Sequence, residues 1–410
     1  MTDPKTRQFI LDHHGDDPHA LALHARRFPD IDMAFAVEQI AGWQKAKGKL
    51  PSWAACNDIV YPAHLALEQC SSETTALYKA RLCQRLLGTG TPETDSGVMA
   101  DLTGGMGVDF SFLAPLFQRA IYIERQPALC QCARHNFQAL QLEQAEVWEG
   151  DSMQQLEQLP NLQLLFIDPA RRDKNGLRTH AIGDCSPDIL PVLPELLDKA
   201  NFLMVKLSPM LDWHETVRSL EAVCPNCVGE VHLVATANEC KELLVILSRH
   251  DDNRTVRICC ANDDDLFITD TATEQTSTPL PVVGDAEEAM AASWLYEPNA
   301  AVMKAGCFST LTQRFPVRAL SANSHLFLSD TRLEGFPGRE LRILRSSTMN
   351  KRQLQACLGD IRQANITVRN FPLSVAELRK RLHIADGGDI YIFASTVAKR
   401  DHLIFVCNKA

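Results

Sequence analysis

The sequence predicts an α/β fold in which a largely parallel sheet follows a helical N-terminal region and precedes a small α+β domain. Three observations support this prediction. Apolar residues recur at helical spacing before residue 90, short apolar strands alternate with helix-like stretches from Gly97, and strands and helices mix again after Arg339. A chain of 410 residues has room for two to four domains. We expect four segments, with bounds 1–90, 91–250, 251–334 and 335–410.

Composition and charge limit the class of protein. The chain is 45% hydrophobic and 22% charged, which fits globular domains with apolar cores. Its apolar runs are too short to cross a bilayer, and the N-terminus lacks a basic stretch followed by an apolar one. We therefore expect a cytoplasmic protein without a membrane partner, with reduced cysteines. Cys224 and Cys227 have metal-ligand spacing but lack a matching second pair, so no metal is expected.

The N-terminal segment predicts two long helices. One covers about 32–47 and ends at Leu50-Pro51, and the other covers about 72–87, before the linker-like residues 88–92. The apolar residues of the first are Met33, Phe35, Ala36, Ile40 and Trp43. Those of the second are Ala76, Leu77, Ala80, Cys83 and Leu87.

Short apolar strands are predicted throughout the segment 91–250. Helix-like stretches separate most of them, which is typical of a parallel sheet with helices on both faces. The last two are too close in sequence for a helical crossover, so we expect them to form an antiparallel pair at one edge. The predicted strands are Val98–Leu102, Arg119–Ile123, Ala145–Trp148, Leu162–Ile167, Phe202–Lys206, Gly229–Ala235 and Glu242–Ser248.

Strands and helices are also predicted in the C-terminal segments. Residues 262–280 contain three consecutive aspartates and many threonines, and we expect them to form an exposed loop. From Arg339 onward a compact unit is predicted, in which Ser374 and Glu377 form a capping box that opens a helix ending at His383. Its other predicted elements are strands at 341–344, 366–370, 390–395 and 402–406 and a helix at 351–361.

Acidic residues follow four successive strands of the predicted sheet. Asp101 ends the first strand and is followed by the turn Leu102-Thr103-Gly104-Gly105-Met106-Gly107, whose glycines allow a ligand to approach the backbone. Glu124 could accept hydrogen bonds from both hydroxyls of a ribose, and Asp151 from the amino group of adenine. The glycine spacing does not match the dinucleotide fingerprint. Together with Asp168, these carboxylates suit a cationic sulfonium ligand that has a ribose and an adenine but no phosphate.

The stretch from Asp101 to Asp168 resembles the class I S-adenosylmethionine-dependent methyltransferases in its glycine-rich turn, two acidic ligands and Asp-Pro loop. This resemblance implies a Rossmann-like seven-stranded sheet with an antiparallel seventh strand, and S-adenosyl-L-methionine as cofactor. The implied cofactor-binding residues are Asp101, Thr103, Gly104, Gly105, Gly107, Glu124, Asp151 and Asp168. Residues 68–73 are similar to a segment that many RNA methyltransferases fold over the methionine end of the cofactor, which adds Ser71 and Ser72. A serine before a glutamate is equally typical of a helix cap.

The loop that begins at Asp168 is the candidate catalytic loop. Asp168 could orient a nucleophile or accept its proton, and Pro169 would stiffen the loop. Arg171 stands where related enzymes carry an aromatic residue, and it could stack on a base, hold a phosphate or remain solvated. Lys206, at the end of the fifth strand, is expected at the same cleft. It could neutralise a phosphate or a carbonyl oxygen, or pair with Asp168 or Asp212.

The chain as a whole resembles a bacterial group of methyltransferases with a helical N-terminus, a ferredoxin-like insert and a THUMP-like C-terminal domain, a domain type associated with RNA. The net charge is −10, but residues 331–410 carry 14 basic and 7 acidic side chains while the rest carries 27 basic and 44 acidic ones. This asymmetry predicts RNA, either tRNA or rRNA, as the partner of residues 335–410. The expected contacts are Arg342, Arg345, Arg369, Arg379, Lys380 and Arg381.

Three functions remain open at the level of sequence. The first is an RNA base methyltransferase, which the motifs and the basic C-terminal segment favour. The second is a methyltransferase of protein or small molecules that uses its C-terminal domain to dimerise. The third is a non-catalytic RNA-binding protein with a degenerate cofactor fold, which the intact Asp168-Pro169 pair disfavours. A nicotinamide-dependent dehydrogenase is the poorest fit, because the glycine spacing is wrong.

Overall fold

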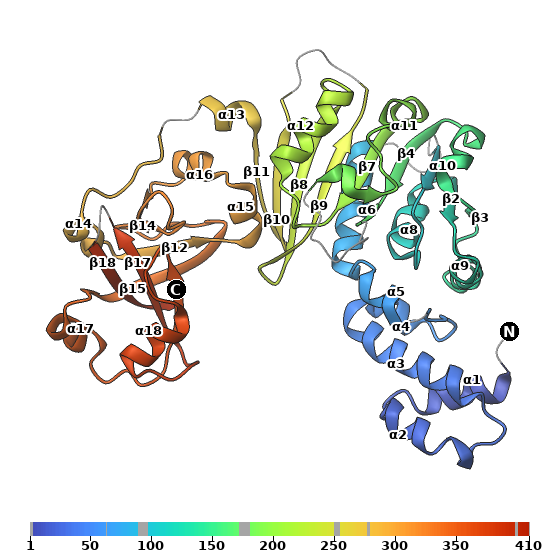
Figure 1. Ribbon diagram of the computed structural model, residues 1–410, viewed down its shortest axis with the longest axis horizontal. Coiled ribbons are helices and arrows are strands. Elements are labelled where there is room, and N and C mark those ends of the chain that lie inside the picture. Colours follow the sequence, from blue (N-terminus) through green and yellow to red (C-terminus); the bar gives the residue numbers. More distant parts are fainter. Residues whose placement is uncertain are drawn as a thin grey trace. The chain divides into compact units, whose positions relative to one another are not determined.

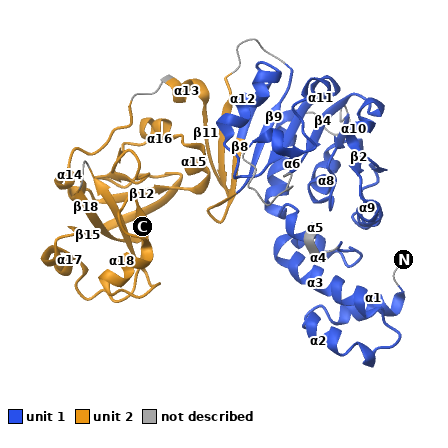
Figure 2. Cartoon of the chain, in the orientation of Figure 1, with its two compact units in different colours: residues 1–231, 241–254 blue, residues 232–240, 255–410 orange. Residues whose placement is uncertain are grey.

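The computed structural model in Figure 1 describes residues 3–62, 64–88, 97–171, 181–249, 255–276, 279–397 and 401–409. The side chains of residues 64, 65, 171 and 276 are outside this description. The chain divides into two compact units (Figure 2), residues 1–231 with 241–254, and residues 232–240 with 255–410. Within the described ranges, no helix has both the length and the apolar character needed to cross a membrane.

Helices precede the sheet in the first unit. The two predicted long helices are confirmed as α3 and α6. Asp32 caps the first and Ser72 the second, each accepting a hydrogen bond from a backbone N–H in the first turn. The helices of this region are α1 (Pro4–Asp12), α2 (Pro18–Leu23), η1 (Ala25–Arg27), α3 (Met33–Lys49), α4 (Pro51–Ala55), α5 (His64–Gln69) and α6 (Glu73–Leu87).

A largely parallel sheet forms the centre of the first unit. Its strands run in the order β9-β7-β4-β1-β2-β3, and all of these pairs are parallel except β7 with β9. The strands are β1 (Val98–Asp101), β2 (Arg119–Glu124), β3 (Ala145–Glu149), β4 (Leu162–Ile167), β7 (Ala200–Leu207), β8 (Val228–Thr236) and β9 (Glu239–Leu247). The predicted seven strands and the antiparallel seventh strand are confirmed, and β9 lies between β7 and β8. The expectation that the last two strands lie at the edge is wrong, because β10 (Arg257–Asn262) and β11 (Asp265–Asp270) follow β8 in a nine-stranded sheet.

Helices between the strands pack against this sheet and against one another. α9 packs against β2 and β3, α11 packs against β4 and β7, and α8 packs against α6. The helices are α8 (Val108–Leu113), η2 (Ala114–Leu116), α9 (Pro127–Ala139), α10 (Ser152–Gln155), η3 (Leu156–Gln158), η4 (Ile182–Asp184), α11 (Leu193–Lys199) and α12 (Trp213–Val223). After β4, β5 (Ala170–Arg171) pairs with β6 (Cys185–Ser186). Parallel strands place their carboxyl ends at one edge, where the candidate site lies.

The second unit contains a hairpin and a seven-stranded sheet of order β13-β14-β12-β15-β18-β17-β16. The prediction of an exposed loop at 262–280 is wrong. β10 (Arg257–Asn262) and β11 (Asp265–Asp270) form an antiparallel hairpin around Asp263, and α13 (Thr271–Thr276) follows. Phe267 and Thr269 alternate with exposed or half-buried neighbours, which is the two-residue period of a strand.

The seven-stranded sheet combines strands from residues 294–329 with strands from residues 338–409. The capping box of Ser374 and Glu377 is confirmed at the start of α18. The strands are β12 (Trp294–Pro298), β13 (Arg318–Ala319), β14 (Phe327–Ser329), β15 (Gly338–Thr348), β16 (Asn365–Arg369), β17 (Ile390–Val397) and β18 (Asp401–Lys409). The helices are α14 (Ala286–Ala291), α15 (Ala300–Ala305), α16 (Phe308–Arg314), α17 (Lys351–Leu358) and α18 (Val375–Leu382).

Candidate active site

The glycine-rich turn between β1 and α8 forms the centre of the site. Gly105 and Gly107 have φ angles of +56° and +81°, a backbone conformation that glycine adopts most readily. At Gly104 the restriction is steric, because a Cβ atom there would lie 2.2 Å from Cε2 of Tyr122. The Tyr122 hydroxyl also donates a hydrogen bond to the carbonyl oxygen of Gly105. The ring of Tyr122 therefore holds the turn against the sheet.

Glu124, the last residue of β2, faces this turn. Its side chain is buried, and its carboxylate accepts hydrogen bonds from the backbone N–H of Gly105 at 2.9 Å and of Gln126 at 2.8 Å. Two backbone donors fix the orientation of the carboxylate, while its remaining lone pairs can still accept hydrogen bonds. Glu124 is thus able to bind ribose hydroxyls, the role that the sequence predicts for it.

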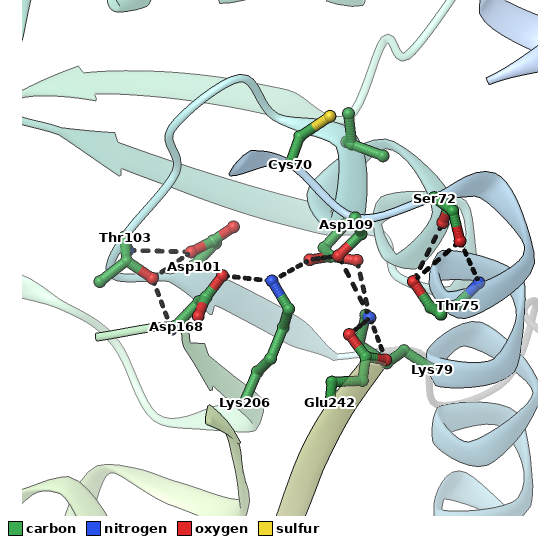
Figure 3. Close-up of polar contacts among 12 residues, drawn as sticks. Cys70, Ser72, Thr75, Lys79, Asp101, Thr103, Asp109, Asp168, Lys206 and Glu242 are labelled. Carbon is green, nitrogen blue, oxygen red and sulfur yellow. Dashed lines mark hydrogen bonds and ion pairs between the residues drawn. The ribbon is translucent and has the colours of Figure 1, made fainter. Parts of the chain in front are cut away.

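Asp101 lies at the buried carboxyl end of β1, next to the candidate catalytic loop (Figure 3). Its Oδ1 accepts a hydrogen bond from the backbone N–H of Thr103 at 2.9 Å. The Thr103 hydroxyl in turn accepts one from the backbone N–H of Asp168 at 2.7 Å. Burial, together with the nearby carboxylates of Asp109, Asp168 and Glu124, raises the pKa of Asp101 to about 8.

Lys206, on β7, joins two of these carboxylates. Its ammonium donates a hydrogen bond to Oδ2 of Asp168, and it lies 3.6 Å from Oδ2 of Asp109 (Figure 3). The sequence predicted either Asp168 or Asp212 as a partner of Lys206. In the structure Lys206 pairs with Asp168, and Asp212 instead caps α12. Burial alone would lower the pKa of Lys206, but Asp168, Asp109 and Glu242 raise it above its usual range. Lys206 is therefore a cation at the floor of the site.

A second layer of charge lies beneath Lys206. Lys79 of α6 is fully buried and donates hydrogen bonds to both carboxylate oxygens of Glu242, at 2.6 and 2.8 Å. Its ammonium also lies 3.1 Å from Oδ1 of Asp109, and Ser71 donates a hydrogen bond to Oδ2 of Asp109 at 2.7 Å. Burial opposes the ionisation of Asp109, yet Lys79 and Lys206 lower its pKa below the ordinary value. Asp109 therefore stays ionised between two lysines.

Sequence reasoning missed Lys79, Asp109 and Glu242. Lys79 carried a usable signal, because it falls between Ala76 and Cys83 on the apolar stripe of a helix, where a lysine is buried only when it is paired. Its partner Glu242 is 163 positions away, and no local pattern connects the two.

The remaining predicted residues have separate positions. Ser72 caps α6 and accepts a hydrogen bond from the backbone N–H of Thr75. Its neighbour Ser71 instead donates a hydrogen bond to the buried Asp109. Asp151 is exposed and caps α10. Pro169 is buried behind Asp168. Arg171 lies in β5 with its side chain outside the described part of the chain, as is all of Arg172.

A cavity of about 1380 Å³ lies at this site, and most of the predicted site residues line it. It extends over the carboxyl ends of the central strands and is bordered on one side by residues of α3 and α5, including Glu38 and Gln69. The predicted site residues that line it are Ser71, Asp101, Thr103, Gly104, Gly105, Gly107, Glu124, Asp151, Asp168, Pro169 and Lys206.

The chemistry of this lining fits S-adenosylmethionine. Asp101, Asp109, Glu124 and Asp168 are acidic, so they would repel phosphates and can bind hydroxyl, ammonium or sulfonium groups. Gly105 lines the cavity and has no side chain, so a ligand can approach its backbone directly. A Rossmann-like sheet with this acidic cavity at its carboxyl edge defines a methyltransferase of class I.

Comparisons with known proteins agree with this class. Family models match residues 294–337 as a ferredoxin-like domain and residues 338–409 as a THUMP-like domain. A crystal structure described as a putative methyltransferase from Porphyromonas gingivalis W83 is 31% identical, with a TM-score of 0.84 and coverage of 100% of both chains. An uncharacterised S-adenosylmethionine-dependent methyltransferase of Mycobacterium tuberculosis is 26% identical over 322 residues, which is 78% of this chain and 80% of that protein.

The chain belongs to the class I S-adenosylmethionine-dependent methyltransferases, in the group that carries a THUMP-like C-terminal domain. It is an enzyme, and S-adenosylmethionine is its cofactor.

Proposed function

We propose that this methyltransferase modifies a base in tRNA or rRNA, which its second unit recruits. The observation that carries the proposal is the match of a THUMP-like domain to residues 338–409, within a segment whose net charge is +7. The other 330 residues carry a net charge of −17. An acidic catalytic unit repels a polyanion, so RNA needs a separate basic surface for recruitment.

The six cations that the sequence predicts as RNA contacts differ in how free their side chains are to bind phosphate. Arg369 binds the buried Glu297 at 2.9 Å, and Arg379 binds Asp386 and two backbone carbonyl oxygens. These two arginines are held by the fold of the second unit. The others have exposed side chains, and we propose them as the main phosphate contacts: Arg342, Arg345, Lys380 and Arg381.

We also propose the roles of the site residues in the reaction. The bound cofactor supplies a sulfonium methyl group for in-line transfer to a nucleophile. Asp168, at the mouth of the cavity with its side chain 38% exposed, would orient that nucleophile and accept its proton. Lys206 would hold the carboxylate of Asp168 in place, and Pro169 would limit the freedom of the loop. Arg171, a residue of β5, would contact the base or a neighbouring phosphate.

The proposed cofactor residues are those of the glycine-rich turn together with Ser71, Asp101, Glu124 and Asp151. Glu124 offers the sharpest test. In Glu124→Gln the amide can keep the shape of the site but cannot accept hydrogen bonds through both ends. The affinity for S-adenosylmethionine should fall by about 1–3 kcal/mol in calorimetry. An unchanged affinity would show that the ribose binds elsewhere.

The substrate proposal is tested by incubating the full chain with methyl-labelled S-adenosylmethionine and separate pools of cellular RNA, protein and metabolites. We expect the label in RNA. Label confined to protein or metabolites would replace RNA by the corresponding substrate class, and RNA binding without label would favour a non-catalytic binding protein.

Recruitment is tested with charge-neutralising variants of the full chain. Lys380→Gln with Arg381→Gln should weaken binding of bulk tRNA and reduce the salt dependence of the logarithm of affinity by about two. The control pair is Arg26→Gln with Arg27→Gln, two exposed neighbouring arginines of the first unit, which should leave both quantities unchanged. Equal effects of the two pairs would contradict a specific role for the second unit.

A further inference from the structure

Lys206 lies between the cavity and a buried cluster of charged side chains formed by Lys79, Asp109 and Glu242. Its ammonium contacts Asp168, which is 38% exposed, on one side and Asp109, which is 9% exposed, on the other. Asp109 is fixed from behind by Lys79 and Ser71, and Lys79 is fixed by two hydrogen bonds to Glu242. Among the described cations of this cluster, Lys206 is the one that lines the cavity, because Lys79 lies behind it.

The cluster has more negative than positive groups. Asp109, Asp168 and Glu242 are opposed by Lys79 and Lys206, and the buried Asp101 lies beside them. Removing Lys206 would leave Asp168 without its cation and Asp109 with one cation instead of two. The net charge of this cluster therefore depends on Lys206.

Methyl transfer changes the charge on the sulfur atom of the cofactor. The donor carries a positive sulfonium, and after the methyl group leaves, the product S-adenosylhomocysteine carries a neutral thioether. Donor and product share their other charged groups, so excess negative charge near the sulfur favours the donor through its sulfonium alone. A cation at the same place reduces this difference, since it repels the sulfonium and hardly affects the neutral thioether.

We propose that Lys206, held between Asp168 and Asp109, sets how strongly the site prefers the cationic methyl donor over the neutral product. Lys206 is thus a specificity-determining residue for the cofactor. The inference rests on the proposed cofactor site and is independent of the RNA substrate.

The test is calorimetric binding of three ligands to variants of the full chain at one fixed pH. The ligands are S-adenosylmethionine, S-adenosylhomocysteine and a donor analogue with a protonated amine in place of the sulfonium. In Lys206→Met the ratio of product to donor dissociation constants should rise roughly tenfold, as expected for one charge several ångströms away. The amine analogue should behave like the donor.

Three further variants separate the effect of charge from damage to the fold. Asp168→Asn should lower the same ratio, because it removes a carboxylate near the sulfonium. Lys206→Met combined with Asp168→Asn removes one charge of each sign, so its ratio should return close to that of the wild type. Lys241→Met removes an exposed lysine from the rim of the same cavity and should change the ratio little, because solvent screens that charge.

The outcomes distinguish the proposal from its premise. An unchanged ratio in Lys206→Met, or equal weakening of all three ligands, would overturn the role of Lys206. Glu124→Gln should weaken both donor and product, because both contain the ribose. If Glu124→Gln has no effect on either ligand, the proposed cofactor site itself fails, whatever Lys206 does.

Discussion

The hydroxyl of Thr103 accepts a hydrogen bond from the backbone N–H of Asp168, at 2.7 Å. Thr103 belongs to the glycine-rich turn after β1, and Asp168 begins the loop after β4, so this bond connects the proposed cofactor turn to the proposed catalytic loop. The backbone N–H of Thr103 is itself bound to Asp101. A change at Thr103 should therefore alter the position of Asp168.

Thr103→Val tests this connection. The substitution keeps the shape of the side chain but leaves the partly buried N–H of Asp168 without its acceptor, at a cost of about 1 kcal/mol. We expect turnover to fall roughly tenfold while the affinity for S-adenosylmethionine changes less. Steady-state kinetics and calorimetry measure the two effects. Thr103→Ser keeps the hydroxyl and should behave like the wild type, so a matching loss in the serine variant would argue against the hydrogen bond.

Asp168→Asn should separate binding from turnover more strongly. The amide keeps the size of the side chain and cannot accept a proton from the nucleophile. We expect turnover to fall on the order of a hundredfold or more, which exceeds the roughly tenfold loss of S-adenosylmethionine affinity expected from the missing charge. Single-turnover transfer of a labelled methyl group measures the loss. If turnover survives, the loop has a structural role and proton removal must occur without Asp168.

Asp101 should make the stability of the folded protein depend on pH. Its folded-state pKa of about 8 is above the ordinary value of 3.8, so the folded protein binds the extra proton between these two values. The free energy of unfolding should consequently fall as the pH rises through this window. Asp101→Asn removes this group and should flatten that slope in urea denaturation measured at several pH values.

The same carboxyl predicts proton release when the donor binds near neutral pH. The sulfonium favours the ionised form of Asp101, so binding should displace its proton. Calorimetry in buffers of different ionisation enthalpy measures the number of protons released. A wild-type protein that releases no more protons than Asp101→Asn would show that Asp101 is already ionised.

Gly104→Ala should destabilise the first unit. The added methyl group would lie 2.2 Å from Cε2 and 2.4 Å from Cζ of Tyr122, so the ring or the turn must move. The expected cost is about 1–3 kcal/mol in the free energy of unfolding, measured by chemical denaturation. Gly48→Ala is the matched control, because it lies in α3 with no atom within 4 Å of its Cβ position. That variant should be neutral or stabilised by up to about 1 kcal/mol.

The sequence was most informative where the relevant signal is local. The strand ends at Asp101, Glu124 and Asp168 could be located because apolar strands alternate with helices, and parallel strands place their carboxyl ends together. The glycine-rich turn was equally visible, although the reason for Gly104 required the position of Tyr122. The second layer was not predictable, since Lys79 meets Glu242 only through the fold.

The region of 262–280 shows why a local signal can also mislead. Three aspartates at 263–265 predicted a solvated loop, and they occupy the turn and start of a hairpin instead. The alternation of Phe267 and Thr269 indicated the strand, but it extends over too few residues to outweigh the acidic composition. The pairing of Arg369 with Glu297, 72 positions apart, likewise depends on tertiary structure.

The central claim, methylation of an RNA base, is tested most directly in cells. Nucleosides from total RNA of a strain lacking this gene are compared by mass spectrometry with those of the parent strain. We predict that one methylated nucleoside is lost or reduced, and that the wild-type chain restores it while Asp168→Asn does not. An unchanged set of methylated nucleosides, with the purified enzyme transferring label to a protein or a metabolite, would contradict the account.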